Sequence, residues 1–589
     1  MKKRYLLPLS ILSLLAMIGC SSTGSDSTTD TSEEVGNAYD YNEEITIDDP
    51  RDIEVEETTA DFELSTSDGT YSQSGTTYTL TSGGTYTLTG KLLGQIIINA
   101  GDNDEVVLEL NNTSITCSTD SPIKAINADK VEISAKSDTG NIVKDTRSHK
   151  TTDSESQGEG AISADCDLKL KGTGTLVVTG NYNNAVHTTK DLTIQKLTLK
   201  ATGYNNAIKG KDSVAMKSGT VQAYAATGNG IKTEDSDLSS NNKQRGTISI
   251  TGGTLYVDSL HDGIDASYNV ELDEEDSEVS TQISVKTGTN SSYYNKSSFK
   301  ADSEKGLKAE NEIVINKGTI VIAASDDAIH ANYGTTLENG SKSLGNITVN
   351  DGLIKVASGD DGLHADNTLL MNGGKVVVTG ASEGYEANYI TINGGYSYIY
   401  GTDDGVNVSK KSFNSCAFTM SGGYLDVAVS NGDTDGIDSN GNFTLSGGTI
   451  VTRGSPGTGS GMSTGLDVDG TISMTGGTLI AFNGLEKSPT ASNTIKYAAT
   501  SGATSNTGFG GGQGMMPKKA AGSNSGGSIT AGNYTLTGDG IDISFTNDYV
   551  YSSFLIYSSY LTTNSTYTLA RSGTTVYSWT QSSNSVTIS

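Results

Sequence analysis

Regularly spaced carboxylates are the side chains of this 589-residue chain that are best suited to hold an ion. They lie in short turns, and several are doubled: Asp262, Asp265, Asp326, Asp327, Asp360, Asp361, Asp403, Asp404, Asp435 and Asp438. Neighbouring carboxylates repel each other unless a cation lies between them, and oxygen ligands from several chain segments suit Ca²⁺. The set therefore predicts Ca²⁺ sites, although solvated acidic turns remain the alternative for any single pair.

A repeat unit places these carboxylates. It consists of a small residue, an aliphatic residue or Tyr, and a polar residue, as in Ala207-Ile208-Lys209, Gly263-Ile264-Asp265 and Gly362-Leu363-His364. The unit recurs with a base period of about 22 residues, and longer intervals indicate loop insertions. A phased repeat of this kind argues against a disordered low-complexity chain, and a β-propeller would need a period of about 40 residues.

The segments between these units alternate between apolar and polar residues and turn at glycines, as in residues 248–255 and 418–425. Such alternation indicates short strands, and three strands in about 22 residues form one coil of a parallel β-helix. Stacked coils bury a continuous core, and right-handed crossovers are strongly preferred. We therefore predict an all-β fold in which residues 64–499 form a right-handed parallel β-helix, a solenoid with β caps.

Stacking converts positions of the repeat into columns of side chains. The residue after each inward aliphatic residue points outward, because side chains alternate along a strand. This outward column contains Lys124, Ser163, His187, Lys209, Lys232, Asp265, Lys308, His330, His364, Glu386, Asn407, Asp438 and Asp467. The residue before each small residue forms a second column, here called the turn column: Glu159, Asn184, Asn206, Asn229, Asp262, Lys305, Asp327, Asp361, Glu383, Asp404, Asp435 and Thr464. Its first asparagines favour a structural amide ladder, whereas its later part is rich in carboxylates.

Tyrosines form a second candidate surface. Tyr182 and Tyr204 are one period apart and are expected to stack, and Tyr396, Tyr398 and Tyr400 alternate on one expected strand. Exposed Tyr rings combine an apolar face with a hydrogen-bonding tip, as sugar rings require. These five residues are therefore candidate carbohydrate contacts, with tyrosines on a solvated wall as the alternative.

The composition excludes other classes. The chain has 39 Lys and Arg against 69 Asp and Glu, a net charge of −30, which is the wrong sign for a nucleic-acid partner. The 71 glycines and only 6 prolines exclude a collagen-like or Pro-rich chain. Cys117, Cys166 and Cys416 lack metal-type spacing and are expected to be small buried residues, with any disulfide left open.

The N-terminus predicts export. Lys2, Lys3 and Arg4 precede an apolar run that is too short to cross a bilayer, and residues 16–20 resemble a bacterial lipobox. We predict a lipoprotein signal peptide at residues 1–19 and a lipid anchor on Cys20, with an ordinary signal peptide as the alternative. The protein is then held at the bacterial cell surface or cell envelope.

Three further segments complete the organisation. Residues 20–63 are predicted to form an acidic, disordered tether, since residues 24–63 hold 15 acidic residues and one basic residue. Residues 500–528 are predicted to form a Gly/Ser-rich loop. Residues 529–589 alternate again and are expected to form a C-terminal β cap that covers a sheet edge.

Several segments resemble a bacterial β-helix family named for a clostridial calcium-containing, carbohydrate-binding protein. The similar stretches are residues 85–90, 96–102, 106–110, 141–145, 262–266 and 446–448. The resemblance covers roughly residues 64–589. It implies a right-handed parallel β-helix, bound Ca²⁺, and binding to cellulose-like and acidic, pectin-like polysaccharides.

A more distant resemblance is to polysaccharide lyase family nine, whose calcium motif is Asp-Asp-Gly-x-Asp. Residues 261–265 and 434–438 lack its first Asp, and residues 360–364 and 403–407 lack its last. The departures argue against lyase activity.

Three functions are compatible with these features. The first is Ca²⁺-dependent, non-catalytic polysaccharide binding. The second is a lyase that cleaves polyuronate by Ca²⁺-assisted β-elimination, with Lys308 as the base. Lys308 is also the expected ion-pair partner of Asp265, which is the structural alternative. The third is an adhesion stalk; the sequence does not give the oligomeric state.

Overall fold

The computed structural model describes residues 45–48, 50–151, 157–275, 279–300, 302–456, 463–489, 495–500 and 529–588. The chain divides into the units Met1–Glu34 and Val35–Ser589, and every described residue belongs to the second. The predicted signal peptide, Cys20, the first part of the tether and the loop at residues 501–528 lie outside the described residues.

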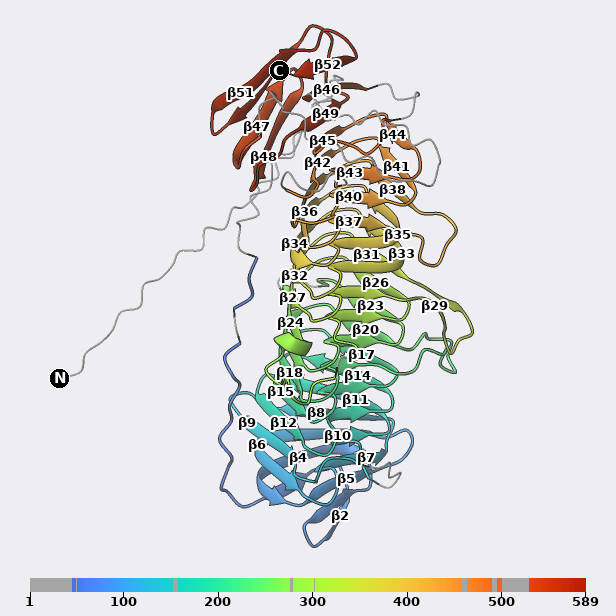
Figure 1. Ribbon diagram of the computed structural model, residues 1–589. Helices are drawn as coiled ribbons and strands as arrows, with labels where there is room; N and C mark the ends of the chain where they lie inside the picture. The colour runs from blue at the N-terminus through green and yellow to red at the C-terminus, as the bar shows by residue number, and fades with distance from the viewer. Residues whose placement is uncertain are drawn as a thin grey trace, which may run out of the picture. The chain divides into compact units, whose positions relative to one another are not determined.

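The described chain is all-β and is built around one large, mostly parallel sheet of 46 strands (Figure 1). The helical structure in the described part is a short 3-10 turn, η1 (Gly288–Asn290). None of the described residues forms a helix of the length and apolarity needed to cross a membrane.

Strand pairing follows the repeat of the sequence. β10 (Gly160–Ala164) pairs in parallel with β13 (Asn184–Thr188), which pairs with β16 (Ile208–Gly210). The next strands of this series pair in the same way: β19 (Ile231–Lys232), β22 (Ile264–Ala266), β25 (Leu307–Ala309), β28 (Ile329–Ala331), β33 (Leu363–Met371), β35 (Tyr385–Ile392), β37 (Val406–Val408), β40 (Ile437–Ser439) and β43 (Leu466–Val468). Each repeat unit therefore lies directly beside the same unit of the next repeat.

The aliphatic residue of each unit points into the core. Ile208, Ile264, Leu307 and Ile329 are fully buried and belong to one continuous hydrophobic cluster. Burying such a side chain contributes about 1.5–3 kcal/mol, so the phased aliphatic positions are sufficient to fix the register.

Glycine is required where the coils turn. Gly423 lies before β39 (Tyr424–Val429) with a φ of 81°, a conformation that side chains rarely adopt. A Cβ atom on Gly423 would lie 2.7 Å from the carbonyl oxygen of Gly395 in the preceding coil. The Gly-Gly corners therefore permit both the turn and the close approach of successive coils.

The C-terminal residues close one edge of the sheet. β49 (Phe554–Ser558) pairs antiparallel with β45 (Thr478–Phe482), which is the last strand of its parallel series. A four-stranded sheet follows in the order β48-β47-β50-β51, comprising β47 (Gly532–Gly538), β48 (Ile541–Asn547), β50 (Thr566–Arg571) and β51 (Thr574–Thr580). Trp579 is buried in the core of this part.

Residues 50–63 contact the large sheet, which differs from the disordered tether expected for this part of the sequence. The side-chain amide of Gln222 donates to the carbonyl of Arg51 at 2.7 Å and accepts from the amide of Ile53 at 3.2 Å. Lys200 forms an ion pair with Asp52. Gln222 is buried on β18 (Gly219–Ala225), and its polar amide therefore needs these backbone partners.

Cys117, Cys166 and Cys416 are buried, as expected, and all three are free thiols, which answers the open question of a disulfide. Burial raises the pKa of the Cys166 thiol to about 12, with neighbouring carboxylates adding to the effect. This cysteine is consequently a packing residue and not a reactive thiolate.

Candidate functional site

The outward column is continuous in the structure. Register partners run without a break from Lys124 through Asp265 to Asp467. Its members are less exposed than an outward position implies, since His187 and His364 are only 6% and 8% exposed. Side chains on strands about 4.8 Å apart cover one another, which explains the burial. The column is therefore a packed polar array whose charges act on each other.

The turn column shows one recurring hydrogen bond. The side-chain oxygen of each of several members accepts the backbone N–H of the member in the next coil. Asn206 Oδ1 accepts from Asn229 at 3.1 Å, and Asp404 Oδ1 accepts from Asp435 at 2.7 Å. Neutral Asn and charged Asp thus serve the same structural purpose. The negative charge of the later members is not needed for stacking.

Asp262 and Asp265 lie among lysines. Lys308 Nζ lies 3.7 Å from Asp262 Oδ2 and 3.7 Å from Asp265 Oδ1, and Lys232 also pairs with Asp265. Asn229 donates to the same Asp265 carboxylate at 2.9 Å. The two aspartates predicted as metal ligands therefore already have ammonium partners.

Lys308, the base of the lyase hypothesis, is held in its charged form. Burial by itself lowers the pKa of its ammonium, but Asp265, Asp262 and Glu310 outweigh burial and raise that pKa above its ordinary value. A general base must be unprotonated at the working pH. This environment matches the ion-pair alternative for Lys308.

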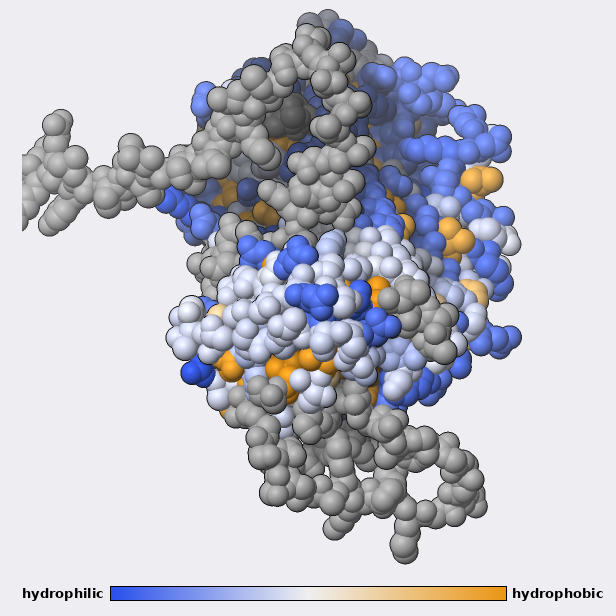
Figure 2. Space-filling view, turned by 90° about the horizontal axis from the view of Figure 1, so that it is seen from above, coloured by the Kyte–Doolittle hydropathy of each residue, from blue (hydrophilic) through white to orange (hydrophobic). Residues whose placement is uncertain are grey.

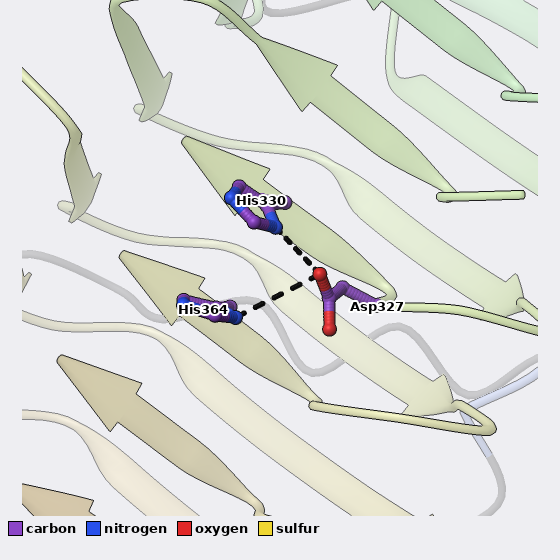
Figure 3. A group of neighbouring side chains, drawn as sticks. All are labelled: Asp327, His330 and His364. Carbon is purple, nitrogen blue, oxygen red and sulfur yellow. Dashed lines mark hydrogen bonds and ion pairs between the residues drawn. The ribbon is translucent and has the colours of Figure 1, made fainter. Parts of the chain in front are cut away.

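A histidine cluster lies in the middle of the outward column. We define it as Asp327, His330, Asp361, His364 and Glu386, carried by β28, β33, β35 and the turns before the first two strands. His330 Nδ1 lies 2.5 Å from Asp327 Oδ2, and His364 Nδ1 lies 3.7 Å from the same oxygen (Figure 3). His364 Nδ1 is also 2.9 Å from Asp361 Oδ2, and its Nε2 is 3.4 Å from Glu386 Oε2.

The charges of this cluster perturb one another strongly. Burial lowers the pKa of His364, but bonds to Asp327, Asp361 and Asp366 outweigh it and raise that pKa to about 11. Burial raises the pKa of Asp327, but the two histidines and Lys305 hold it well below its usual range. Lys305 Nζ bridges Asp327 and Asp326 at 2.7 Å each.

The sequence pattern places His330 and His364 in the outward column but does not predict them as metal ligands. Their alignment in the repeat is the signal that could have identified them. Asp366, which follows the repeat unit, and Lys411, from an inserted loop, also contact His364, at 3.4 and 3.2 Å. The period carried no signal for either residue.

Farther along the chain, carboxylates of the turn column and of the outward column form one group. We call this group the acidic column: Glu383, Asp404, Asp435, Asp438 and Asp467. Within the described residues, no Lys or Arg forms an ion pair with Asp404, Asp435 or Asp438. Burial raises the pKa of Asp404 and of Asp435 to about 7, and nearby carboxylates add to the rise. The same causes raise the pKa of Asp438 to about 6.

Two oxygens of this region are buried without a hydrogen-bond partner among the described residues, namely Asn407 Oδ1 and Asp467 Oδ1. Both belong to the outward column beside the carboxylates. Unpartnered acceptors next to unpaired carboxylates form a set of hard oxygen donors. Such a set matches the preference of Ca²⁺.

The remaining predicted metal ligands differ in their surroundings. Asp326, Asp327 and Asp360 each place one carboxylate oxygen within 4.8 Å of the others, with Lys305 against the first two. Asp361 belongs to the histidine cluster, where its carboxylate pairs with His364. Asp403 is exposed beside the acidic column.

A family model described as carbohydrate-binding domain-containing protein matches residues 74–345 and 338–450, which together exceed half of the chain. The chain belongs to this carbohydrate-binding domain family. A carbohydrate-binding domain-containing protein of Acetivibrio thermocellus is 31% identical over 209 residues, which cover 35% of this chain and 65% of that relative. The chain therefore spans slightly less than two thirds of the relative's length.

Among solved structures, the polysaccharide lyase-like protein from C. thermocellum, as a gadolinium derivative, is 29% identical with a TM-score of 0.34. The match covers 38% of this chain and 86% of that chain. Within the present chain, the segment matched by the carbohydrate-binding family model includes the histidine cluster and the acidic column as far as Asp438, whereas Asp467 and the cap follow it.

The tyrosines predicted as carbohydrate contacts fall into two groups. Tyr182 is buried beneath the guanidinium of Arg147, 4.0 Å from the ring centroid, and the ring of Tyr204 stacks on His149 at 3.7 Å. Each ring thus has a partner other than the expected one, and the face of Tyr182 is covered by Arg147.

Tyr396, Tyr398 and Tyr400 share the outward face of β36 (Tyr396–Gly401), as expected. Tyr396 is 41% exposed, and its ring lies 6.4 Å from that of Tyr424. These three tyrosines remain the candidate contacts for a glycan. In the view of Figure 2 the described surface is mostly hydrophilic, with small apolar patches.

Proposed function

We propose that this member of the carbohydrate-binding family is a non-catalytic, Ca²⁺-dependent polysaccharide-binding protein of the bacterial cell surface. Three members of the acidic column carry the proposal. Asp404, Asp435 and Asp438 are partly buried, are not paired with Lys or Arg in the described chain, and have raised pKa values. Acids in that state favour the entry of a cation, because it removes their mutual repulsion.

The donor chemistry supports Ca²⁺. Asp404, Asp435 and Asp438 supply carboxylate oxygens, and the unpartnered oxygens of Asn407 and Asp467 lie in the same region. Bound Ca²⁺ would contribute positive charge that bridges the protein to the carboxylates of a uronate-containing polysaccharide. Neutral, cellulose-like chains would instead depend on aromatic faces such as Tyr396.

The fold proposed for this function is a right-handed parallel β-helix. The parallel pairing of each repeat with the next supports it. The proposed anchor is lipid on Cys20 after removal of residues 1–19, which would hold the binding face outside the cell membrane.

The environment of Lys308 favours binding over β-elimination. Its ammonium faces Asp262 and Asp265, and its pKa is raised, so it is protonated at neutral pH. A lyase would release unsaturated, ultraviolet-absorbing products from polygalacturonate in the presence of Ca²⁺. We expect no such products.

Affinity electrophoresis tests the proposal. The full chain should be retarded in gels containing polygalacturonate plus Ca²⁺, and a chelator should restore its mobility. Gels containing a soluble cellulose-like glucan separate the contribution of neutral sugars. Unchanged mobility with both glycans in the presence of Ca²⁺ would overturn the proposal.

A further inference from the structure

The histidine cluster brings nitrogen and oxygen donors together at one point. Asp327, His330 and His364 each offer one ligand atom, and these atoms lie within 4.8 Å of one another. Figure 3 shows the two imidazoles on adjacent strands, both with a nitrogen facing the Asp327 carboxylate. The rings are stacked with centroids 4.3 Å apart.

Two polar atoms of the cluster are unsatisfied. His330 Nε2 and Asp361 Oδ1 have no hydrogen-bond partner among the described residues, although the two residues are only 9% and 2% exposed. A buried polar atom without a partner costs about 1–3 kcal/mol. Within a cluster of potential ligands, such atoms indicate that the network is incomplete.

The charges also favour a divalent cation. Asp327, Asp361, Asp366 and Glu386 surround the two imidazoles, while Lys305 and Lys411 contact the edges of the group. A divalent metal ion between the two imidazoles would place two positive charges at one point among these carboxylates.

We propose that Asp327, His330 and His364 bind one transition-metal ion with an affinity for imidazole, of which Zn²⁺ is the prime candidate. Imidazole nitrogen suits Zn²⁺ and related ions, whereas Ca²⁺ takes oxygen ligands. Bonds of about 2.0–2.2 Å require the three side chains to close in by small rotations. Lys305 keeps Asp326 as a partner when Asp327 turns to the metal.

This site is chemically distinct from the Ca²⁺ sites proposed above. It uses nitrogen donors on β28 and β33, whereas the acidic column uses oxygen donors on later coils. Each site is tested with its own ion and its own variants, so failure of one leaves the other unaffected.

Titration calorimetry of the chelator-treated full chain with ZnCl₂, in saturating Ca²⁺, tests the site. We expect one Zn²⁺ per chain, and a loss of at least tenfold in affinity for His330→Gln and for His364→Gln. His187→Gln is the matched control, because His187 occupies the same outward column outside the cluster. The affinity of the His187→Gln variant for Zn²⁺ should equal that of the wild type.

Binding of Zn²⁺ by the two cluster variants with wild-type affinity would overturn the proposal, as would the absence of Zn²⁺ binding by the wild type. Circular dichroism checks that the variants fold. The wild-type chain provides a second readout with Co²⁺, whose visible absorption should change to the stronger bands of an imidazole-bound ion. A spectrum equal to that of Co²⁺ in water would contradict the site even if a variant failed to fold.

Discussion

At the scale of single residues, Asp404 and Asp435 combine a structural hydrogen bond with a charge that the bond does not need. The side chain of each accepts a backbone N–H from the next coil, as Asn206 does in an earlier coil. In the absence of a cation, their charges repel one another in partly buried positions. Structure and ion binding can therefore be separated by replacing Asp with Asn.

The double variant Asp404→Asn and Asp435→Asn should unfold at the same temperature as the wild type or higher when a chelator is present. Asn preserves the acceptor and removes the repulsion. Added Ca²⁺ should raise the melting temperature of the wild type by several degrees and that of the variant less. Asp433→Asn, an exposed neighbour, serves as the control. A strongly lowered melting temperature of the double variant in chelator would contradict this separation.

His187 makes the fold sensitive to acid. Burial, followed by the charge of Lys209, lowers the pKa of its imidazole to about 4 from an ordinary value of 6.5. Its Nδ1 has no partner among the described residues. As the pH falls below about 6.5, the unfolded chain gains a proton that the folded chain binds only near pH 4. The contribution of His187 to the free energy of unfolding is thus complete above the pKa that it has in the unfolded chain, and it declines toward pH 4.

The measurement is thermal unfolding between pH 7 and pH 4.5 for the wild type and for His187→Gln. The wild type should lose more stability over this interval than the variant, which lacks the titrating group. Equal pH slopes in the two proteins would show that His187 is not responsible.

At the scale of the structural elements, the glycine corners control how closely coils stack. Gly423→Ala would combine a φ of 81° with a Cβ only 2.7 Å from a neighbouring carbonyl oxygen. We expect a loss of about 1–3 kcal/mol in the free energy of unfolding, measured by denaturant titration. Gly380→Ala is the control, because a Cβ there meets nothing within 4 Å. Similar stability of the two variants would contradict the proposed role of the corner.

The strand register could be predicted because each coil repeats the same unit. An aliphatic residue that is buried once per period fixes which side chains lie beside each other, and the pairing of Asp265 with Lys308 follows directly. Features outside the period could not be predicted. Lys411 reaches His364 from an inserted loop, and Arg147 covers Tyr182 from another.

Burial was the other property that periodicity could not supply. Alternation indicates which way a side chain leaves the strand, but not whether its neighbours cover it. His364 points away from the apolar core and is nevertheless 8% exposed, because adjacent charged side chains enclose it. Burial alone would lower the pKa of His364, and the bonds to Asp327, Asp361 and Asp366 outweigh burial and raise it.

At the scale of the whole molecule, we propose that Ca²⁺ joins the acidic column to the glycan. The net charge of −30 opposes the approach of an acidic polysaccharide, so binding of such a polymer should depend on the cation. Neutral glucans are not subject to this repulsion, and their binding should depend less on Ca²⁺.

The most direct test is calorimetric titration of oligogalacturonate into the full chain, with Ca²⁺ and with chelator, for the wild type and the double variant Asp404→Asn and Asp435→Asn. We predict binding by the wild type with Ca²⁺, its loss in chelator, and at least tenfold weaker binding by the variant. Binding of equal strength in chelator, or by the variant with Ca²⁺, would contradict Ca²⁺-dependent binding through the acidic column.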